Sequence, residues 1–542
     1  MKENSENRSI RLRQVFAYHE ATKHHFQNYA KGPGTMDWAT QPDPFRRYAG
    51  ARLIPLEKLP PTDAPIYDDA FVQGKISPAP IDLRSISQLF YDSLALSAWK
   101  SIGTTSWALR VNPSSGNLHP TESYLICGPI DGLHDEPLVC HYAPKQHGLE
   151  VRATFAPELW GGLCKQFPKD TFFIGLTSIH WREAWKYGER AFRYCQHDVG
   201  HAIGAITIAA AGLGWRTRIL DDLGTDGLAT LMGTFGDHDA EPEAPDLLLA
   251  VGPLVEDVHE MNLSEDLMAA FQSLDWQGSP NSLSSAQVQW GMEEMEKACW
   301  KPQGPVRYGA FARLPPPTSL ESRPVSLRKI IHQRRSAVAM DGETRISRDT
   351  FYGILHRTLP NNMPFSPLPW RPHIHLAIFV HRVDDLPNGL YFLVRDSAQR
   401  DALQAALTQA DPWQRPVGCP EQLDLFRLIE GQTGEAARRI SCSQEIASEG
   451  CFSLGMIAEY EEPLQKYGPW FYPRLYWEAG VIGQVLYLEA EAAGIRSTGI
   501  GCYFDDPMHE VLGFKDRKYQ DLYHFTLGGP VEDTRLTTLP PY

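Results

Sequence analysis

One pattern occurs twice in this chain, and its two copies lie 280 residues apart. Lys186-Tyr187-Gly188 returns as Lys466-Tyr467-Gly468, and at the same offset Asp198-Val-Gly200 returns as Glu478-Ala-Gly480. Two further single glycines coincide at this offset. Because separate features align without an insertion, we predict a duplicated domain, and the function has to be sought in both copies together.

The composition is that of a globular protein, and its charge argues against nucleic acid as a partner. The chain has 542 residues and a formal net charge of −15, without a run rich in lysine or arginine. A nucleic-acid site needs a basic face, so none is expected. The longest apolar stretch, residues 202–214, is shorter than the roughly 20 residues that cross a bilayer. It is interpreted as a buried helix, and no membrane partner is expected.

The N-terminal segment and the cysteines predict a cytoplasmic protein. Residues 1–8 are polar and lack the apolar core of a signal peptide. The 9 cysteines are scattered without a CxxC pair, and an odd number does not suit a disulfide framework. We therefore expect reduced thiols and a cytoplasmic location.

Proline-rich and glycine-rich stretches divide the chain into four predicted parts. A lead-in ends in proline-rich turns, and a connector between the copies contains Gly278–Ser285 and Leu314–Pro317. The predicted parts are a lead-in or cap over 1–80, the first copy over 81–256, the connector over 257–325 and the second copy over 326–542.

Both copies mix strands with one long helix. In the first copy we expect strands over 123–127, 171–176 and 246–251 and a helix over 191–211. In the second copy we expect helices over 326–331 and 476–493 and strands over 373–380, 389–394 and 524–527. The predicted fold class is α+β, with two similar domains forming an intrachain pseudo-dimer whose long helices pack across a pseudo-twofold axis.

Two segments of the second copy could hold a phosphate. Arg334-Arg335-Ser336 follows a predicted helix, and planar guanidinium forks grip phosphate oxygens. A solvated arginine pair closing a helix is the commoner situation on the motif alone. Arg535 follows the last strand, whereas the matching stretch 251–258 has no basic residue. It is either a second phosphate arm or a terminal surface charge.

Two loops offer polar groups or close backbone approach to a flat ligand. Pro113, Ser114, Ser115 and Asn117 precede a strand of the first copy and bring donors and acceptors to a tight loop, although turns of this composition are common. In the second copy, Ser497–Cys502 contains two glycines, which let backbone N–H groups come near a flat ring.

Proton transfer has two candidate pairs. Lys186 and Tyr187, or Lys466 and Tyr467, could donate or accept protons near a carbonyl or ring nitrogen. A structural role, such as tyrosine packing beside a helix start, would also be kept in both copies, and both interpretations stay open. The histidine spacings do not fit a zinc site, because no H-E-x-x-H pattern is present, so no metal is expected.

Together these motifs resemble the nitroreductase superfamily, and within it the SagB/ThcOx-type dehydrogenases. The resemblance covers about residues 81–255 and 326–542, and the lead-in is similar to the opening of tandem SagB-like proteins. It implies FMN bound at the interface of two α+β domains. In that arrangement Arg334, Arg335, Ser336 and Arg535 would hold the phosphate; Gly499, Gly501 and Cys502 would follow the isoalloxazine near N5; and Pro113, Ser114, Ser115 and Asn117 would reach the ring from the other domain. It also ties a Lys-Tyr pair to substrate oxidation.

Each copy departs from the family pattern in a different place. Where the first copy should carry the arginine pair it has Phe90–Ser97, which contains no arginine. Where the second copy should carry the Pro-Ser-Ser loop it has Leu359–Ser366. Because both losses fall in the same one of the two possible sites, we expect a single FMN between the two halves.

The resemblance implies an FMN-dependent oxidoreductase that removes two electrons from a small or peptide-derived substrate, such as an azoline. An NAD(P)H-dependent reductase of nitro compounds or quinones is the alternative within the enzymes. A non-catalytic binding scaffold with degenerate flavin sites is the alternative outside them. The chain is expected to act as a monomer, since it contains its own pseudo-dimer, or as a higher homo-oligomer.

Overall fold

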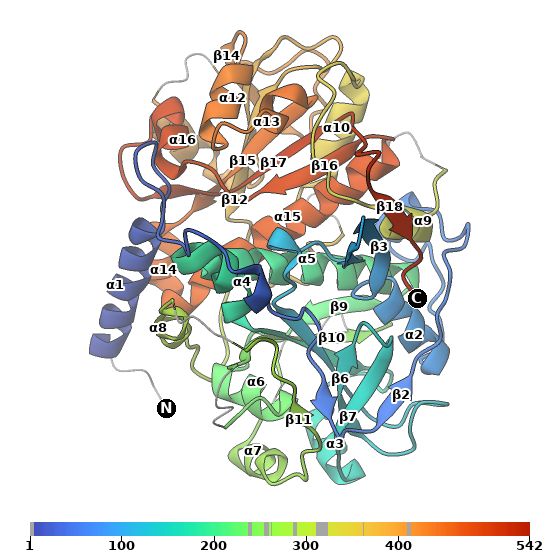
Figure 1. Cartoon of the computed structure of the whole chain (residues 1–542). Helices are drawn as coiled ribbons and strands as arrows, with labels where there is room; N and C mark the ends of the chain where they lie inside the picture. Colours follow the sequence, from blue (N-terminus) through green and yellow to red (C-terminus); the bar gives the residue numbers. More distant parts are fainter. Residues whose placement is uncertain are drawn as a thin grey trace.

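Two antiparallel sheets, one from each copy, flank a pair of long central helices (Figure 1). The computed structural model describes residues 5–236, 241–253, 260–261, 263–285, 290–309, 324–360, 363–408 and 413–542. Part of the predicted connector, including Leu314–Pro317, lies outside these residues. The α+β fold class and the intrachain pseudo-dimer predicted from the sequence are confirmed.

The two main sheets share one strand order. The first sheet has the order β2-β7-β6-β5-β8-β10-β9, and the second has β14-β13-β12-β15-β17-β16. Six strands therefore correspond in order, from β7-β6-β5-β8-β10-β9 to β14-β13-β12-β15-β17-β16, and β2 is the additional edge strand of the first sheet. The strands of the first sheet are β2 (Leu53–Pro55), β5 (Thr121–Cys127), β6 (Leu138–Ala143), β7 (Gly148–Thr154), β8 (Phe172–Ser178), β9 (Arg216–Ile219) and β10 (Ala244–Gly252). Those of the second are β12 (Ile374–Val380), β13 (Gly389–Val394), β14 (Asp424–Glu430), β15 (Phe452–Glu459), β16 (Arg496–Ile500) and β17 (Tyr519–Gly528).

The helices follow the same duplication. Each copy starts with a short helix whose first turn is capped by a side chain. Asp82 caps α2, and Ser326 caps α9. The helices of the first copy are α2 (Leu83–Tyr91), α3 (Pro157–Leu163), α4 (His180–Tyr187), α5 (Ala191–Gly212) and α6 (Thr225–Met232). Those of the second are α9 (Leu327–Gln333), α10 (Arg348–Arg357), α11 (Arg400–Ala406), α12 (Gly434–Ile440), α13 (Ile446–Glu449), α14 (Glu461–Tyr467), α15 (Tyr472–Ala492) and α16 (Asp505–Leu512). Helix α15 starts four residues before its predicted start, with Pro473 in its first turn.

The long helices α5 and α15 cross where each carries the glycine of the repeated motif. A Cβ atom on Gly200 would lie 2.8 Å from the Cα of Gly480 and 2.9 Å from the Cα of Trp477. A Cβ atom on Gly480 would in turn lie 2.7 Å from the Cα of Gly200. Real Cβ atoms do not approach backbone this closely, so the two helices can touch only because both residues lack a side chain.

The lead-in and the C-terminus both cross from one copy to the other. Helix α1 (Ser5–Ala21) packs on the second copy, where Arg8 donates to the carbonyl oxygen of Gln465 at 2.7 Å. At the other end, β18 (Thr537–Leu539) pairs with β3 (Leu96–Ile102) of the first copy, which pairs in turn with β4 (Thr105–Arg110). The remaining elements, in the connector and lead-in, are α7 (Glu265–Gln272), α8 (Met292–Ala298), β1 (Tyr48–Ala49) and β11 (Ser279–Pro280).

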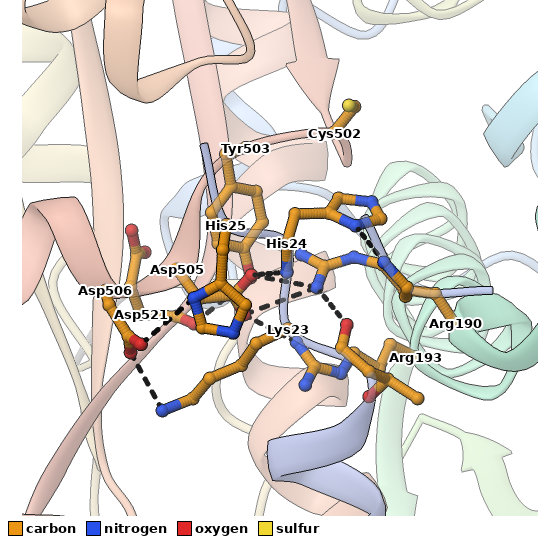
Figure 2. A network of polar contacts seen from close by, with 12 residues as sticks. Lys23, His24, His25, Arg190, Arg193, Cys502, Tyr503, Asp505, Asp506 and Asp521 are labelled. Atoms are coloured by element: carbon orange, nitrogen blue, oxygen red, sulfur yellow. Dashed lines mark hydrogen bonds and ion pairs between the residues drawn. The ribbon is translucent and has the colours of Figure 1, made fainter. Parts of the chain in front are cut away.

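A buried ionic network joins the lead-in to both copies (Figure 2). Asp505 accepts from the Nη1 atoms of Arg190 at 2.9 Å and Arg193 at 2.7 Å, and from the backbone N–H of His24 at 2.9 Å. Burial acts to raise the pKa of Asp505, but the two guanidiniums outweigh it and hold that pKa below its usual range. The network thus joins α5 of the first copy, α16 of the second and the end of α1.

The helix crossing generates a stability prediction. We expect Gly200→Ala to destabilise the protein by about 1–3 kcal/mol or more, because the new methyl group has to push two backbones apart. Gly161→Ala is the matched control, since Gly161 is an exposed glycine of α3 with open space around it. That change should be neutral or gain up to about 1 kcal/mol from helix propensity. Urea unfolding midpoints measure both, and equal midpoints for Gly200→Ala and the wild type would contradict the crossing.

Candidate functional site

A cavity of about 500 Å³ lies between the two copies and is lined by both. Residues predicted for the site come together here from segments far apart in the chain. They are Pro113, Ser114, Ser115, Asn117 and Tyr187 from the first copy and Arg334, Arg335, Ser336, Gly499, Gly501 and Cys502 from the second.

Three arginines line this cavity without an ion-paired carboxylate among the described residues: Arg110 and Arg334 are buried, and Arg335 is half-buried. Arg334 donates to the carbonyl oxygens of Arg110 at 3.1 Å and Val111 at 3.3 Å, so it reaches from the second copy into the first. Arg335 donates to carbonyl oxygens that include that of Ser97, at 3.1 Å. Across the described ranges, no carboxylate lies within ion-pair distance of Arg110, Arg334 or Arg335.

Burial disfavours the charged form of these arginines. It lowers the pKa of Arg334, and it lowers that of Arg335 to about 10, with the neighbouring Arg334 charge as a further cause. Burial likewise lowers the pKa of Arg110 to about 10. Buried positive charges of this kind are stabilised when an anion binds, and guanidinium forks suit a phosphate.

The Pro-Ser-Ser loop forms the wall that the first copy contributes. It lies between β4 and β5, and Ser115–Asn117 form one 3-10 turn with Gly116 at φ +59°. A Cβ atom on Gly116 would lie 2.7 Å from the hydroxyl oxygen of Tyr187. Glycine is therefore required both by the backbone conformation and by the close approach of that tyrosine.

The glycine segment of the second copy also lines the cavity. Strand β16 pairs with β17, and the N–H of Gly499 donates to the Tyr487 hydroxyl at 3.1 Å. That hydroxyl also lies 2.8 Å from the Oγ of Ser336. Tyr487 thereby links the glycine strand to the arginine segment, so that two predicted parts of the site are held in one hydrogen-bonded unit.

Asp198, the acidic residue of the repeated motif, lies in the cavity wall. It is buried and accepts from the backbone N–H of Ser115 at 3.0 Å and from its Oγ at 3.1 Å. Burial raises the pKa of Asp198 to about 7 despite these hydrogen bonds. The buried Glu183 lies close by, and burial, then the Asp198 charge, raise the pKa of Glu183 well above its usual value. In the second copy Glu478 accepts from Arg395 instead.

The two Lys-Tyr pairs have different surroundings. Tyr187 lines the cavity, and its ring centroid lies 4.6 Å from that of Tyr194, whose hydroxyl donates to Gly501 O at 3.0 Å. The Lys186 amine lies 5.3 Å from the Tyr187 ring centroid but is not part of the lining. Lys466 and Tyr467 lie outside the cavity lining altogether.

The position related to the cavity by the duplication is filled with side chains. Arg474, which corresponds to Tyr194 at the 280-residue offset, makes a buried ion pair with Asp221. Tyr308 of the connector donates to the same carboxylate. Its ring centroid also lies 5.2 Å from that of Tyr467 and 6.3 Å from that of Phe471.

Arg535 is not part of the cavity lining. Its side chain is 76% exposed and forms an ion pair with Asp533 at 2.8 Å. Asp533 itself does line the cavity. The short segment after β17 thus turns the charge of Arg535 toward a neighbouring carboxylate at the surface rather than toward the buried arginines.

Several lining residues were not singled out from the sequence. Arg110, Tyr487 and Tyr523 belong to predicted or unassigned strands and helices, where a buried aromatic or a strand-end arginine has no distinguishing pattern. His201 also lines the cavity, and its Nε2 lies 3.1 Å from the Tyr523 hydroxyl. Asp198 could have been found, because the duplication marks it.

Comparisons with known proteins support the fold. The chain shares the fold of a provisionally named nitroreductase from Anabaena variabilis, with 21% sequence identity, a TM-score of 0.67 and coverage of 95% of this chain and 99% of that one. A provisionally named nitroreductase of Methanocaldococcus jannaschii is 24% identical over 97 residues, which are 18% of this chain. That match spans about half, 49%, of the relative's length. No family model matches the chain.

The comparison structure covers nearly the whole chain, so the protein has the nitroreductase fold in duplicate. In the part of the chain that the structure describes, no helix is long and apolar enough to cross a membrane.

Asp198 generates a pH prediction. Its pKa is about 7 in the folded protein and near 3.9 in an unfolded chain. The folded state therefore keeps a proton that the unfolded state has released, and stability falls as pH rises from about 4 to 7. Asp198→Asn removes this titration while keeping an acceptor for Ser115. We compare the free energy of unfolding of the variant with that of the wild type. The variant minus wild-type difference should be more positive at pH 8 than at pH 4 by about 1 kcal/mol or more, since one pKa unit is about 1.4 kcal/mol.

Unfolding midpoints of the wild type and Asp198→Asn at both pH values measure this difference. A constant difference between the two proteins would mean that Asp198 is already ionised in the folded state at low pH.

Proposed function

We propose that the chain is an FMN-dependent oxidoreductase of the SagB type with one composite flavin site between its halves. The observation that carries this assignment is a set of three arginines that line a cavity between the copies without an ion-paired carboxylate among the described residues; Arg110 and Arg334 are buried, and Arg335 is half-buried. Asp198, Glu532 and Asp533 also line the cavity, but none of the three forms an ion pair with these arginines. Guanidinium groups that line a cavity without an ion-paired carboxylate suit an anionic ligand.

The residues around the cavity suit FMN. Its volume of about 500 Å³ falls in the range of roughly 300–1,000 Å³ found for cofactor sites. Arg334, Arg335 and Ser336 would hold the phosphate. The glycine strand, Gly499 to Cys502, would lie along the ring, and the loop at Pro113–Asn117 would close on it from the first copy. When bound, FMN would supply the acceptor for a hydride from the substrate.

A single site per chain follows from the asymmetry of the two positions. The related position lacks an arginine pair, and Tyr308 and the Arg474–Asp221 ion pair occupy it. A buried ion pair and packed aromatic rings cannot be displaced by a ligand without leaving charges unpaired. The second position is therefore proposed to be structural.

Tyr187 is proposed as the proton-transfer residue rather than Tyr467. Tyr187 lies in the cavity wall, whereas Tyr467 packs against the connector residue Tyr308. Burial raises the pKa of Tyr187 well above its usual value, so its hydroxyl keeps its proton at neutral pH and acts as a donor. Lys186 beside the ring and Asp198 across the loop are the charged groups available to orient it.

The substrate class proposed is a small or peptide-derived molecule that loses two electrons, such as an azoline. An NAD(P)H-dependent reductase is the alternative outcome: anaerobic bleaching of bound flavin by NADPH, without bleaching by an azoline peptide, would favour it. A colourless protein that does not take up FMN would favour a binding scaffold.

Flavin content tests the composite site. We expect denatured, purified protein reconstituted beforehand with FMN to release one flavin per chain. The double variant Arg334→Ala with Arg335→Ala should lower FMN affinity by about 100-fold or more, because charge-assisted hydrogen bonds of about 1.5–3 kcal/mol each are lost. Arg345→Ala is the control, an exposed arginine paired with Asp384 away from the lining. Two flavins per chain, or unchanged affinity in a folded double variant, would overturn the assignment.

The duplicated tyrosines provide an internal comparison. Tyr187→Phe should slow anaerobic flavin reduction by a thiazoline-containing peptide by about 100-fold or more, the usual scale of a lost general acid or base. Tyr467→Phe is the same change at the corresponding position. It should leave the rate of flavin reduction within about twofold of the wild-type rate, because Tyr467 does not line the cavity. Stopped-flow absorbance measures both rates. Equal effects of the two variants would remove the distinction between the pairs.

A further inference from the structure

Two cysteines that are 60 residues apart in sequence meet beside the cavity. The sulfur atoms of Cys442 and Cys502 lie 2.6 Å apart. A disulfide bond measures about 2.05 Å, so the two atoms stand only about 0.5 Å from bonding distance. Both side chains are partly exposed, and Cys502 lines the cavity.

The backbone holds Cys442 in an unusual conformation at this place. Cys442 and Ser443 are consecutive residues at φ +53° and +56°, a region that non-glycine residues seldom adopt. Two such residues are strained and persist where surrounding contacts fix them. One fixing contact is Gln444, whose Nε2 donates to the carbonyl oxygens of Cys502 at 3.0 Å and Ser441 at 2.9 Å. The strained turn and the cavity wall are thereby joined.

The surroundings favour a thiolate at Cys502. Its neighbour Cys442 and the Arg190 charge lower the pKa of Cys502, against the effect of burial, whereas the pKa of Cys442 is raised. Arg190 reaches the loop itself, since its Nη2 donates to Gly501 O at 3.4 Å. Arg190 also pairs with Asp505, whose charge acts to raise the pKa of Cys502, but the Cys442 contact and Arg190 together keep that pKa below its usual value (Figure 2). A thiolate near a positive charge is the form that attacks a disulfide.

We propose that Cys442 and Cys502 form a reversible dithiol–disulfide site that exchanges with low-molecular-weight disulfides. In the first step the Cys502 thiolate attacks a disulfide RSSR, forms the mixed disulfide Cys502–S–SR and releases one thiolate RS⁻. Cys442 then loses its proton, attacks the sulfur of Cys502 and releases the second RS⁻. The chain loses two electrons and two protons, and one RSSR becomes two RSH.

Closure of this site would affect the cavity directly. Cys502 follows Gly501 in the cavity wall, and Gln444, two residues after Cys442, also lines the cavity. A bond between the two sulfurs would fix these two segments of the second copy to each other. The exchange itself does not require bound flavin, so the site stands apart from the proposed function.

The test uses the full chain in mixtures of reduced and oxidised glutathione, followed by acid quenching, denaturation, iodoacetamide and peptide mapping. As the mixture becomes more oxidising, we expect alkylated Cys442 and Cys502 to fall together by about tenfold or more, with a cross-linked peptide replacing them. Cys164 and Cys419, also partly exposed, are internal controls and should stay alkylated.

Single serine variants separate the two steps. In Cys442→Ser the reaction should stop at the mixed disulfide, so that one glutathionyl group stays on Cys502. In Cys502→Ser the remaining Cys442 should stay alkylated. The inference is overturned if both thiols of the wild type stay free in excess oxidised glutathione, or if the wild type accumulates the mixed disulfide without the cross-link. Neither result bears on flavin content, so failure here and failure of the proposed function are distinguishable.

Discussion

The contact between Gly200 and Gly480 is the constraint on which the rest of the structure depends. Helices α5 and α15 approach until backbone meets backbone, which is possible only where neither residue has a Cβ atom. The crossing sets the distance and angle between the two copies. It therefore also sets the gap between the loops that each copy contributes, and that gap is the cavity. A hydrophobic core that both copies share lies around this crossing, and each copy also has a smaller core of its own.

Duplication inside one chain permits the two interfacial positions to diverge, which identical subunits cannot do. In one position buried arginines lack acidic partners; in the other Arg474 has Asp221 and Tyr308 beside it. The two acidic residues that correspond in the repeat differ in the same way. Glu478 forms an ion pair with Arg395, whereas Asp198 accepts hydrogen bonds from the uncharged Ser115. In the second position the charged side chains pair with each other, so that position is suited to hold the halves together. In the cavity the arginines lack an ion-paired carboxylate, and the phosphate of the proposed flavin would supply the missing negative charge.

The lead-in and the connector take part in this asymmetry. Tyr308 of the connector packs in the completed position, while the end of α1 brings the His24 backbone to Asp505 beneath the glycine strand. That same buried network places Arg190 under Gly501, next to the thiol pair. Segments outside the repeat therefore determine which position stays open and what charge surrounds its cysteines.

Hydrophobic periodicity and the repeat were enough to predict the fold class, the long helices and most of the central strands, because these depend on local pattern. The repeat also marked Gly200 and Asp198, although the reason for keeping a glycine became clear only at the helix crossing. Arg334 and the loop around Ser115 were expected in the site through the family resemblance, because by residue type alone a solvated arginine pair and a common turn fit them as well.

Tertiary structure alone decided which Lys-Tyr pair meets the cavity, that Arg535 lies at the surface, and that Cys442 reaches Cys502. The physical reason is the same in each case. These are contacts between segments that are distant in sequence, and their energies depend on burial and on partners supplied by other elements. The sequence by itself determined a duplicated α+β chain with unlike copies. Only the packing of those copies on each other decided which of two possible sites is filled with the protein's own side chains and which is open.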